Sequence, residues 1–277
     1  MEYLKLNNGI TMPVLGFGTF MLAGEICEDA VASAIKAGYR MLDTAEAYGN
    51  EAAVGNGIVK SGIDRKELFL VTKVNYKSYE NVRETVEQSL KNLQTDYIDL
   101  LLLHWPFANY YNAWRELEKL YEEGKIRAIG VSNFEPAQLV DLIAYNKVVP
   151  AVDQIETNLY CQRSAQRKWL DKKNVAHMAY APLGQGNRNE MFTEPEVAAL
   201  AEKYHKKPSQ ILLRFLTQSG IIVIPRSTKP EHIRENFDIF DFNLTDDEIA
   251  KLTDFDQKTA MIGNPNSPDL VEMSLTW

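Results

Sequence analysis

The strongest constraint on the fold of this chain is a repeated alternation of short apolar segments and amphipathic stretches. Segments rich in β-branched and apolar residues begin near Met41, Phe69, Ile98, Ile126, Ala151, Val175 and Ile221, and most are about 24 to 29 residues apart. Because a crossover between parallel strands needs about a dozen residues or more, this spacing predicts βα units in a parallel sheet.

The intervals between these segments have the pattern of helices. In residues 28–37 the apolar side chains form one stripe, and Gly38 stands where a helix would end. Residues 81–92 show a second stripe, and Pro136 can open a third helix. The last and longest interval contains two helical stretches, at 194–204 and 209–218. We expect these apolar faces to pack against a sheet, and we assign no catalytic role to their residues.

Residues 15–19 add an eighth strand, and no Pro/Gly/Ser-rich linker or change of composition divides the chain. We therefore expect an α/β protein, a (β/α)8 TIM barrel forming one domain over residues 1–277. Ahead of the first strand, Asn8-Gly9 lies between apolar alternations, which predicts an N-terminal β-hairpin that caps the bottom of the barrel.

The C-terminal segment from Met261 to Trp277 contains Pro265 and Pro268, so it cannot be a regular helix throughout. We expect it to lie across the mouth of the pocket. There Trp277 either contacts substrate or has no role in binding.

Composition excludes several classes of partner. The chain has 30 basic and 38 acidic side chains and hence a net charge of −8, which disfavours nucleic acid as a binding partner. Two cysteines, Cys27 and Cys161, cannot build a disulfide framework, so a reducing compartment and hence the cytoplasm is expected. Residues 1–12 lack the basic and apolar regions of a secretion signal, and no apolar run approaches about 20 residues, so we expect no membrane segment. Without a coiled-coil or swapped segment, a monomer is expected.

Polar side chains follow several of the predicted strands at the point where each strand ends. Asp43 ends the segment that begins at Met41, with Tyr48 shortly after it, Lys73 ends the next, and His104 follows residues 98–103. In a TIM barrel the carboxyl ends of all strands lie on one face, where active sites form. We therefore expect an acid, a phenol, an amine and an imidazole to converge there.

This set of groups suits the protonation of a carbonyl oxygen while another molecule delivers hydride. A phenol is a weak acid, but a nearby Lys73 ammonium is expected to bring the pKa of Tyr48 towards working pH. Asp43 would hold the amine charged and oriented, and neutral His104 would donate a hydrogen bond that positions the carbonyl. The four histidines, His104, His177, His205 and His232, have no HxxxH or HExxH spacing, so no metal is expected.

These residues resemble the aldo-keto reductase superfamily over nearly the whole chain. Residues 41–51, MLDTAEAYGNE, are similar to its first signature, while VTK at 71–73 and LHWP at 103–106 resemble the segments that hold its lysine and histidine. The resemblance implies that Asp43, Tyr48, Lys73 and His104 form the catalytic tetrad of an enzyme that reduces aldehydes or ketones with NAD(P)H.

The family binds its cofactor at the top of the barrel, and the lone GxG at 16–18 is consistent with the lack of a Rossmann unit. The resemblance assigns Ser132, Asn133 and Gln154 to the nicotinamide carboxamide and Tyr180 to stacking on the ring. It further implies cofactor contacts from Gly18, Thr19, Pro182 and Leu183.

Residues 224–236, IPRSTKPEHIREN, resemble the family's second, basic signature. The 2′-phosphate side is assigned to Arg226, Ser227, Thr228 and Lys229, because a guanidinium and neighbouring donors suit a phosphate, and the adenine side to Glu235 and Asn236. His232 stands where many members carry arginine, and imidazole is mostly neutral at pH 7. We therefore expect NADPH to be preferred and NADH to be tolerated.

A further departure is Phe20, where mammalian members often have tryptophan. We expect the substrate pocket to be lined by Phe20, Tyr48, His104, Trp105 and Phe107, an apolar wall around one polar corner. The segments 106–111 and 184–188 are short, which favours an open pocket, as in bacterial members that resemble 2,5-diketo-D-gluconate reductases or prostaglandin F synthase-like enzymes. The specific substrate is not readable.

Three other functions compete with this interpretation. Tyr121 and Lys125 have the YxxxK spacing of short-chain dehydrogenases, but the glycine-rich turn that chemistry requires is absent and Gly124 indicates a helix end. A catalytically silent nucleotide-binding barrel that acts as a regulatory or partner-binding subunit would not oxidise NADPH with an aldehyde. A metal-assisted hydrolase would be sensitive to chelators.

Overall fold

The computed structural model describes residues 1–186 and 188–276. Its main sheet has eight parallel strands whose spatial order follows the chain from β3 to β10. They are β3 (Phe17–Gly18), β4 (Met41–Asp43), β5 (Phe69–Val74), β6 (Leu100–Leu103), β7 (Ile129–Ser132), β8 (Val152–Glu156), β9 (Ala176–Tyr180) and β10 (Ile222–Val223). Nearly every residue of these strands is buried, which explains why they were visible in the sequence as apolar runs.

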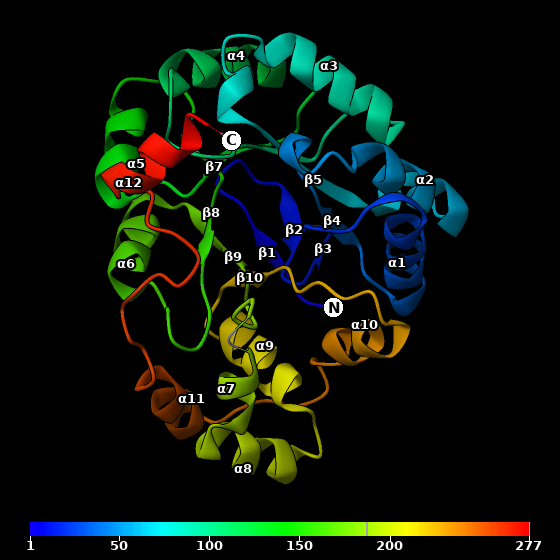
Figure 1. The fold of residues 1–277 in the computed structure, drawn as a ribbon, viewed down its shortest axis with the longest axis vertical. Helices are drawn as coiled ribbons and strands as arrows, with labels where there is room; N and C mark the ends of the chain where they lie inside the picture. The colour runs from blue at the N-terminus through cyan, green and yellow to red at the C-terminus, as the bar shows by residue number, and fades with distance from the viewer. Residues whose placement is uncertain (187, 277) are drawn as a thin grey trace.

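Helices surround the strands, which lie at the centre of the view in Figure 1. The helices are α1 (Gly24–Ala37), α2 (Glu51–Ser61), α3 (Val82–Leu93), α4 (Tyr110–Glu122), α5 (Pro136–Ala144), α6 (Ser164–Lys173), α7 (Arg188–Thr193), α8 (Pro195–Tyr204), α9 (Pro208–Gln218), α10 (Pro230–Phe237), α11 (Asp246–Thr253) and α12 (Pro268–Ser274). Short 3-10 turns are η1 (Glu46–Tyr48), η2 (Arg65–Glu67) and η3 (Tyr76–Ser78).

The two edge strands meet and close the barrel. Leu15 pairs in parallel with Val223. The amide of Gly16 donates to the carbonyl of Val223, and the amide of Val223 donates to the carbonyl of Val14, both at 2.9 Å. At Gly18 a Cβ would lie 2.9 Å from the carbonyl oxygen of Ile224, so glycine is needed for this approach. The predicted (β/α)8 barrel is confirmed.

The N-terminal hairpin is also confirmed. Strands β1 (Tyr3–Lys5) and β2 (Thr11–Pro13) pair antiparallel, and Gly9 takes a left-handed φ of 88° in the turn. The side-chain amides of Asn7 and Asn8 donate to the carbonyls of Pro150 and Arg127, ahead of β8 and β7. These bonds tie the hairpin to the amino-terminal ends of the strands, the bottom of the barrel.

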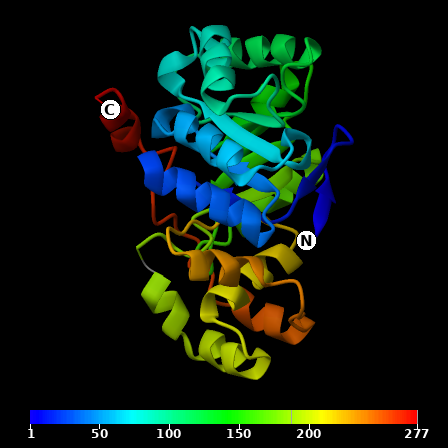
Figure 2. The same ribbon diagram turned by 90° about the vertical axis from the view of Figure 1, so that its right-hand side faces the viewer.

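The C-terminal segment runs along the opposite side of the molecule from the hairpin, as Figure 2 shows. It ends in α12, which is drawn red in Figure 1 and projects at the left edge of the molecule in Figure 2. The buried carboxylate of Glu156 accepts hydrogen bonds from the amides of Met261 (2.9 Å) and Ile262 (3.0 Å), and the Tyr76 hydroxyl donates to the carbonyl of Ser274 at 2.6 Å. The segment is therefore anchored to the last residue of β8 and to the turn that follows β5. Trp277 lies outside the described residues.

The sequence-based prediction did not include helix α7, nor α10 and α11 after β10. The interval between β9 and β10 contains α7 in addition to the two predicted helices, α8 and α9. Helix α7 is six residues long and buries only Met191. One buried side chain produces no apolar periodicity, so the sequence carries no signal for this helix.

Within residues 1–186 and 188–276, no helix has the length and apolar character needed to cross a membrane.

Candidate active site

The four predicted catalytic side chains come from three neighbouring strand ends. Asp43 is the last residue of β4, and Tyr48 ends the turn η1 that follows it. Lys73 lies near the end of β5, and His104 comes directly after β6. The strands pair in the order β4, β5 and β6, so the parallel register brings all four to the same face of the barrel. The structure therefore places them together.

A buried ion pair forms the floor of the site. The Lys73 ammonium donates to Asp43 Oδ1 at 2.7 Å and to the carbonyl of Thr44 at 2.8 Å, and the two side chains are 0% and 2% exposed. Burial lowers the pKa of Lys73, and the Asp43 charge opposes that shift. A buried charge of this kind is tolerated only when it is paired and hydrogen-bonded, so the pair fixes the geometry of both side chains.

Gln154 joins this floor from β8. Its side-chain amide donates to the other carboxylate oxygen of Asp43, Oδ2, at 2.7 Å. Gln154 is 1% exposed, and the same amide nitrogen lies 3.2 Å from the sulfur of Met178. Asp43 is thus held from two sides of the barrel, by an amine on β5 and an amide on β8.

Tyr48 stands above this floor with its ring among aromatic and cationic neighbours. Its ring centroid lies 4.9 Å from that of Phe20, 5.8 Å from that of His104 and 5.1 Å from the Lys73 ammonium. In the described part of the chain, no hydrogen bond involves the Tyr48 hydroxyl. The proton of the phenol is therefore available to a ligand above the floor.

The acidity of Tyr48 differs from the expectation drawn from sequence. Burial, reinforced by the negative charge of Asp43, raises the pKa of Tyr48 well above its ordinary value. The ammonium of Lys73, which donates to Asp43 and Thr44, does not outweigh these two effects. Tyr48 is consequently a neutral phenol that keeps its proton at working pH.

His104 is neutral in this environment. Burial, followed by the nearby Lys73 charge, lowers the pKa of His104 to about 3. A neutral imidazole can donate one hydrogen bond without carrying charge, the form required of a group that orients a carbonyl. The edge of its ring faces Tyr48, with an interplanar angle of 72°.

Amide and hydroxyl groups surround the floor on its β7 and β9 side. The Ser132 hydroxyl donates to the carbonyl of Gln154 at 2.7 Å, and the Asn133 amide donates to the carbonyl of His104 at 3.1 Å. The Tyr180 hydroxyl donates to Asn133 Oδ1 at 2.8 Å. Asn133 adopts a left-handed φ of 64°, which turns its side chain into this network. The three residues predicted from sequence form one connected group.

Some predicted cofactor residues have structural roles as well. Thr19 is fully buried, and its hydroxyl donates to the carbonyl of Asp43 at 2.9 Å. Pro182 is buried and Leu183 packs partly against the hydrophobic core. Asn50, which sequence reasoning did not single out, donates to the carbonyls of Thr19 and Leu22. The sequence signal that could have identified Asn50 is its position near the end of the motif in residues 41–51.

The basic segment after β10 lies at the surface. The exposed residues include Arg226, Thr228, Lys229 and His232, whereas Ser227 and Glu235 are half-buried and Asn236 is buried. Across residues 1–186 and 188–276, the side chains of Arg226, Lys229 and His232 form no hydrogen bond or ion pair. Glu235 borders a hollow of about 600 Å³ together with Lys207 and Arg234. This end of the chain therefore presents unpaired cations to solvent.

Aromatic side chains line one side of the space near Tyr48. Phe20 is 42% exposed and packs on Tyr48, while Trp105 stacks between His104 and Phe107. Phe107 itself is buried and stacks on Trp105. It therefore holds Trp105 in place and contributes little exposed surface of its own. The structure thus assembles the predicted apolar wall beside one polar corner.

The chain matches the family model described as "Aldo/keto reductase family" over residues 14–257. It is 40% identical over 271 residues to the glyoxal reductase of Bacillus subtilis, covering 96% of both proteins. It resembles the crystal structure of MGS-M4, an aldo-keto reductase from a deep-sea metagenome library, with a TM-score of 0.92 and 39% identity over 96% of this chain and 99% of that one. It also resembles a Bombyx mori aldo-keto reductase solved in complex with NADP, with a TM-score of 0.88 and 34% identity over 95% of each chain.

The chain therefore belongs to the aldo/keto reductase family. It is an oxidoreductase of the class that interconverts carbonyl compounds and alcohols.

The donor set of the site fits a nicotinamide cofactor. Ser132, Asn133 and Gln154 bring a hydroxyl and two side-chain amides to neighbouring strand ends, groups complementary to a carboxamide. Arg226 and Lys229 supply exposed cations, to which a phosphate can bind. Among the described residues, no three His, Cys, Asp or Glu side chains are grouped to hold a metal ion.

Proposed function

We propose that this protein reduces an aldehyde or ketone to the alcohol with NADPH, and that Tyr48 supplies the proton. The observation that supports this most is the closed network under Tyr48. Lys73 and Gln154 both bind Asp43, while the phenol above them forms no hydrogen bond with any other described residue. Both oxygens of the Asp43 carboxylate are already bound by Lys73 and Gln154, so the phenol hydroxyl is left for the substrate.

The residues divide the work as follows. The Tyr48 hydroxyl donates its proton to the oxygen of the carbonyl, and the neutral imidazole of His104 donates a hydrogen bond that orients the same oxygen. Lys73, held by Asp43, places a positive charge 5.1 Å from the phenol ring, where it stabilises the phenolate that forms as the proton leaves. When bound, the reduced nicotinamide supplies the hydride.

Cofactor binding falls to two groups of residues. Ser132, Asn133 and Gln154 would hold the carboxamide, with Tyr180 against the ring and Gly18, Thr19, Pro182 and Leu183 lining the approach. Arg226, Ser227, Thr228 and Lys229 would hold the 2′-phosphate, with His232 beside them and Glu235 and Asn236 on the adenine. Because His232 lacks the permanent charge of a guanidinium, we propose that NADPH is preferred and NADH is tolerated.

The substrate is a small carbonyl compound that reaches Tyr48 and His104 along the wall formed by Phe20, Trp105 and Phe107. We further propose that residues 1–277 form a single domain that acts as a cytoplasmic monomer. The family model covers most of the chain, and one continuous barrel contains all the site residues.

The test is a panel of aldehydes and ketones assayed with NADPH and NADH in parallel, followed at the nicotinamide absorbance. We expect steady oxidation of NADPH that is insensitive to a chelator. Binding of NADPH without turnover on any carbonyl would favour a silent nucleotide-binding barrel, and loss of activity with a chelator would favour metal-assisted chemistry.

A further inference from the structure

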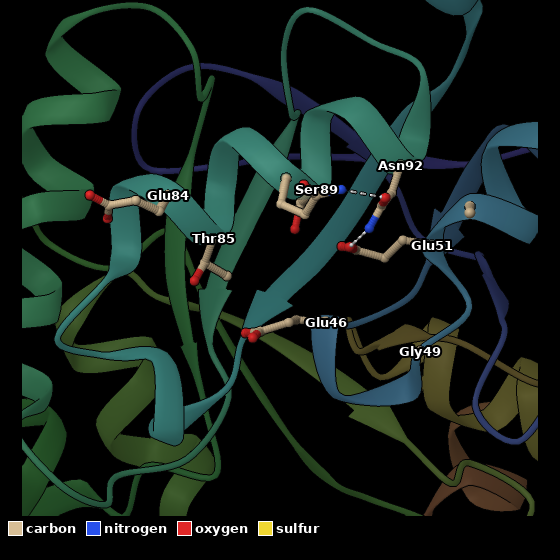
Figure 3. Close-up of a pocket in the computed structure, with 9 residues that line it drawn as sticks. Glu46, Gly49, Glu51, Glu84, Thr85, Ser89 and Asn92 are labelled. Carbon is tan, nitrogen blue, oxygen red and sulfur yellow. Dashed lines mark hydrogen bonds between the residues drawn. The ribbon is translucent and has the colours of Figure 1, made fainter.

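Glu46 lies in the same 3-10 turn as Tyr48, two residues earlier in the chain. Figure 3 shows it at the edge of a hollow of about 370 Å³ between this turn and α3, with Glu84, Thr85 and Asn92 on the other side. The side chain is half-buried and has no role in the chemistry described above.

Both carboxylate oxygens of Glu46 bind the turn η3, which follows β5. Oε2 accepts a hydrogen bond from the amide of Asn75 at 2.7 Å, and Oε1 accepts one from the hydroxyl of Ser78 at 2.5 Å. The turn that carries the phenol is therefore fastened, through one side chain, to the loop that follows Lys73.

The turn η3 is itself attached to other walls of the site. Tyr76 donates to the carbonyl of Ser274 in the C-terminal segment at 2.6 Å. Tyr79 donates to the carbonyl of Trp105 at 2.7 Å and accepts from the amide of Trp105 at 3.2 Å. Glu46 thus connects the Tyr48 turn to the element that positions the aromatic wall and the C-terminal segment.

We propose that Glu46 is a positioning residue for the reduction: its two hydrogen bonds to η3 fix the Tyr48 hydroxyl relative to the substrate oxygen. This inference rests on the proposed function of Tyr48. The backbone of the turn η1 has few other restraints, because among the described residues its internal bonds run only from Tyr48 to Ala45 and from Gly49 to Glu46. Without Glu46, the turn can shift while the buried Asp43–Lys73 pair stays in place.

The role depends on hydrogen-bond geometry and not on charge. A glutamine at this position can accept from the Asn75 amide through its carbonyl oxygen and donate to the Ser78 hydroxyl, which is able to accept. An alanine loses both contacts. Glutamine is therefore expected to preserve the position of Tyr48, whereas alanine is not.

The experiment compares Glu46→Ala, Glu46→Gln and Ser78→Ala with the wild type, each preloaded with NADPH and mixed with a small aldehyde. Because displacement of a reacting group by about 1 Å can cost about 100-fold, we expect Glu46→Ala to slow the single-turnover rate by about 10-fold or more. KM for the aldehyde and Kd for NADPH should change by less than about twofold, since neither binding surface is removed. Glu46→Gln should stay within about threefold of wild type, and Ser78→Ala, which loses one bond, should fall between the two glutamate variants.

Glu84→Ala is the matched control. Glu84 borders the same hollow from α3, is exposed, and enters no hydrogen bond or ion pair with the rest of the described chain, so its removal should leave the rate unchanged. If Glu46→Ala does not fold, as judged by its thermal midpoint, Glu46→Gln and Ser78→Ala decide the question.

The proposal is overturned if Glu46→Ala reduces the aldehyde at the wild-type rate, if Glu46→Gln is as slow as Glu46→Ala, or if Ser78→Ala is indistinguishable from wild type. These outcomes differ from failure of the proposed function, in which the wild type itself oxidises no NADPH with any carbonyl compound.

Discussion

The two ends of the proposed cofactor site are built in opposite ways. At the floor of the barrel, Lys73 and Asp43 are almost completely buried, and the charged atoms of both are held by protein partners. On the loop and helix after β10, Arg226, Lys229 and His232 are exposed and form no hydrogen bond or ion pair in the described part of the chain.

This contrast matches two different tasks: the buried floor serves the chemical step, and the exposed segment after β10 serves recognition of the cofactor phosphate. A transition state is stabilised best by groups that do not reorganise during the reaction, and burial with complete hydrogen bonding provides such groups. Recognition of a phosphate needs only accessible cations, whose contribution is modest and screened by salt. Substitutions at the floor should therefore change kcat by large factors, and substitutions on the loop should change cofactor KM by smaller ones.

The largest effect is expected for Tyr48→Phe. The change preserves the ring contacts with Phe20 and His104 but removes the proton donor, so kcat should fall by at least about 100-fold. The measurement is steady-state NADPH oxidation with a good aldehyde substrate, accompanied by NADPH titration of intrinsic fluorescence to establish that cofactor affinity is unchanged.

Tyr145→Phe is the control for this change, because Tyr145 is 70% exposed and lies at the end of α5. A Tyr48→Phe variant that retains near wild-type kcat would show that the closed floor supports some other proton donor.

A smaller effect is expected for Arg226→Ala. Loss of the guanidinium should raise KM for NADPH by about 10-fold while KM for NADH changes little, since only NADPH has the 2′-phosphate. The difference should shrink as ionic strength rises, because the group is exposed. Kinetics with both cofactors at two salt concentrations measure this. Arg115→Ala, an exposed position on α4, serves as control; equal losses with both cofactors would contradict the assignment of Arg226 to the phosphate.

His232→Arg should act in the other direction. A permanent charge beside Arg226 and Lys229 is expected to raise the ratio of kcat/KM for NADPH to that for NADH by about 3- to 10-fold. The ratio is measured with one aldehyde at fixed salt, with His205→Arg as control for added charge. An unchanged ratio would place His232 away from the phosphate, and a wild type that prefers NADH would show that Arg226 and Lys229 had been overrated.

Most of the barrel was predictable because its strands are buried on both faces. A strand such as β6, Leu100–Leu103, is then a continuous apolar run, and a polar residue such as His104 stands out where the run ends. The tetrad was predictable for the same reason. Glu46 and Asn50 lie within the motif at 41–51, but their roles were not singled out, because the backbone groups of distant loops that they bind are known only from the structure. The direction of the pKa shift of Tyr48 was predicted wrongly, since burial and the charge of Asp43 raise this pKa, and only the structure reveals how deeply the phenol is enclosed.

The smallest effect concerns a second buried carboxyl, Asp153, which precedes Gln154 on β8. Unlike Asp43 it has no side-chain partner among the described residues: neither of its oxygens accepts a hydrogen bond of normal geometry, and the backbone amide of Phe134 only partly offsets the effect of burial. Burial, reinforced by the charge of Glu135, raises the pKa of Asp153 well above its usual value.

The pH dependence of stability follows from this shift. Because the folded-state pKa is raised, the protonated carboxyl is tolerated below the unfolded pKa of about 4, and stability is lost as pH rises from there towards the folded-state pKa. Asp153→Asn removes the titration while keeping the size of the side chain. It should raise the free energy of unfolding at pH 8 by about 1 kcal/mol, and the gain should disappear towards pH 4. Urea unfolding at several pH values measures the difference, and Asp269→Asn, on the exposed side of α12, is the control. A gain that does not depend on pH would mean that the pKa of Asp153 is the same in the folded and unfolded states, or that the amide finds a partner the carboxyl lacks.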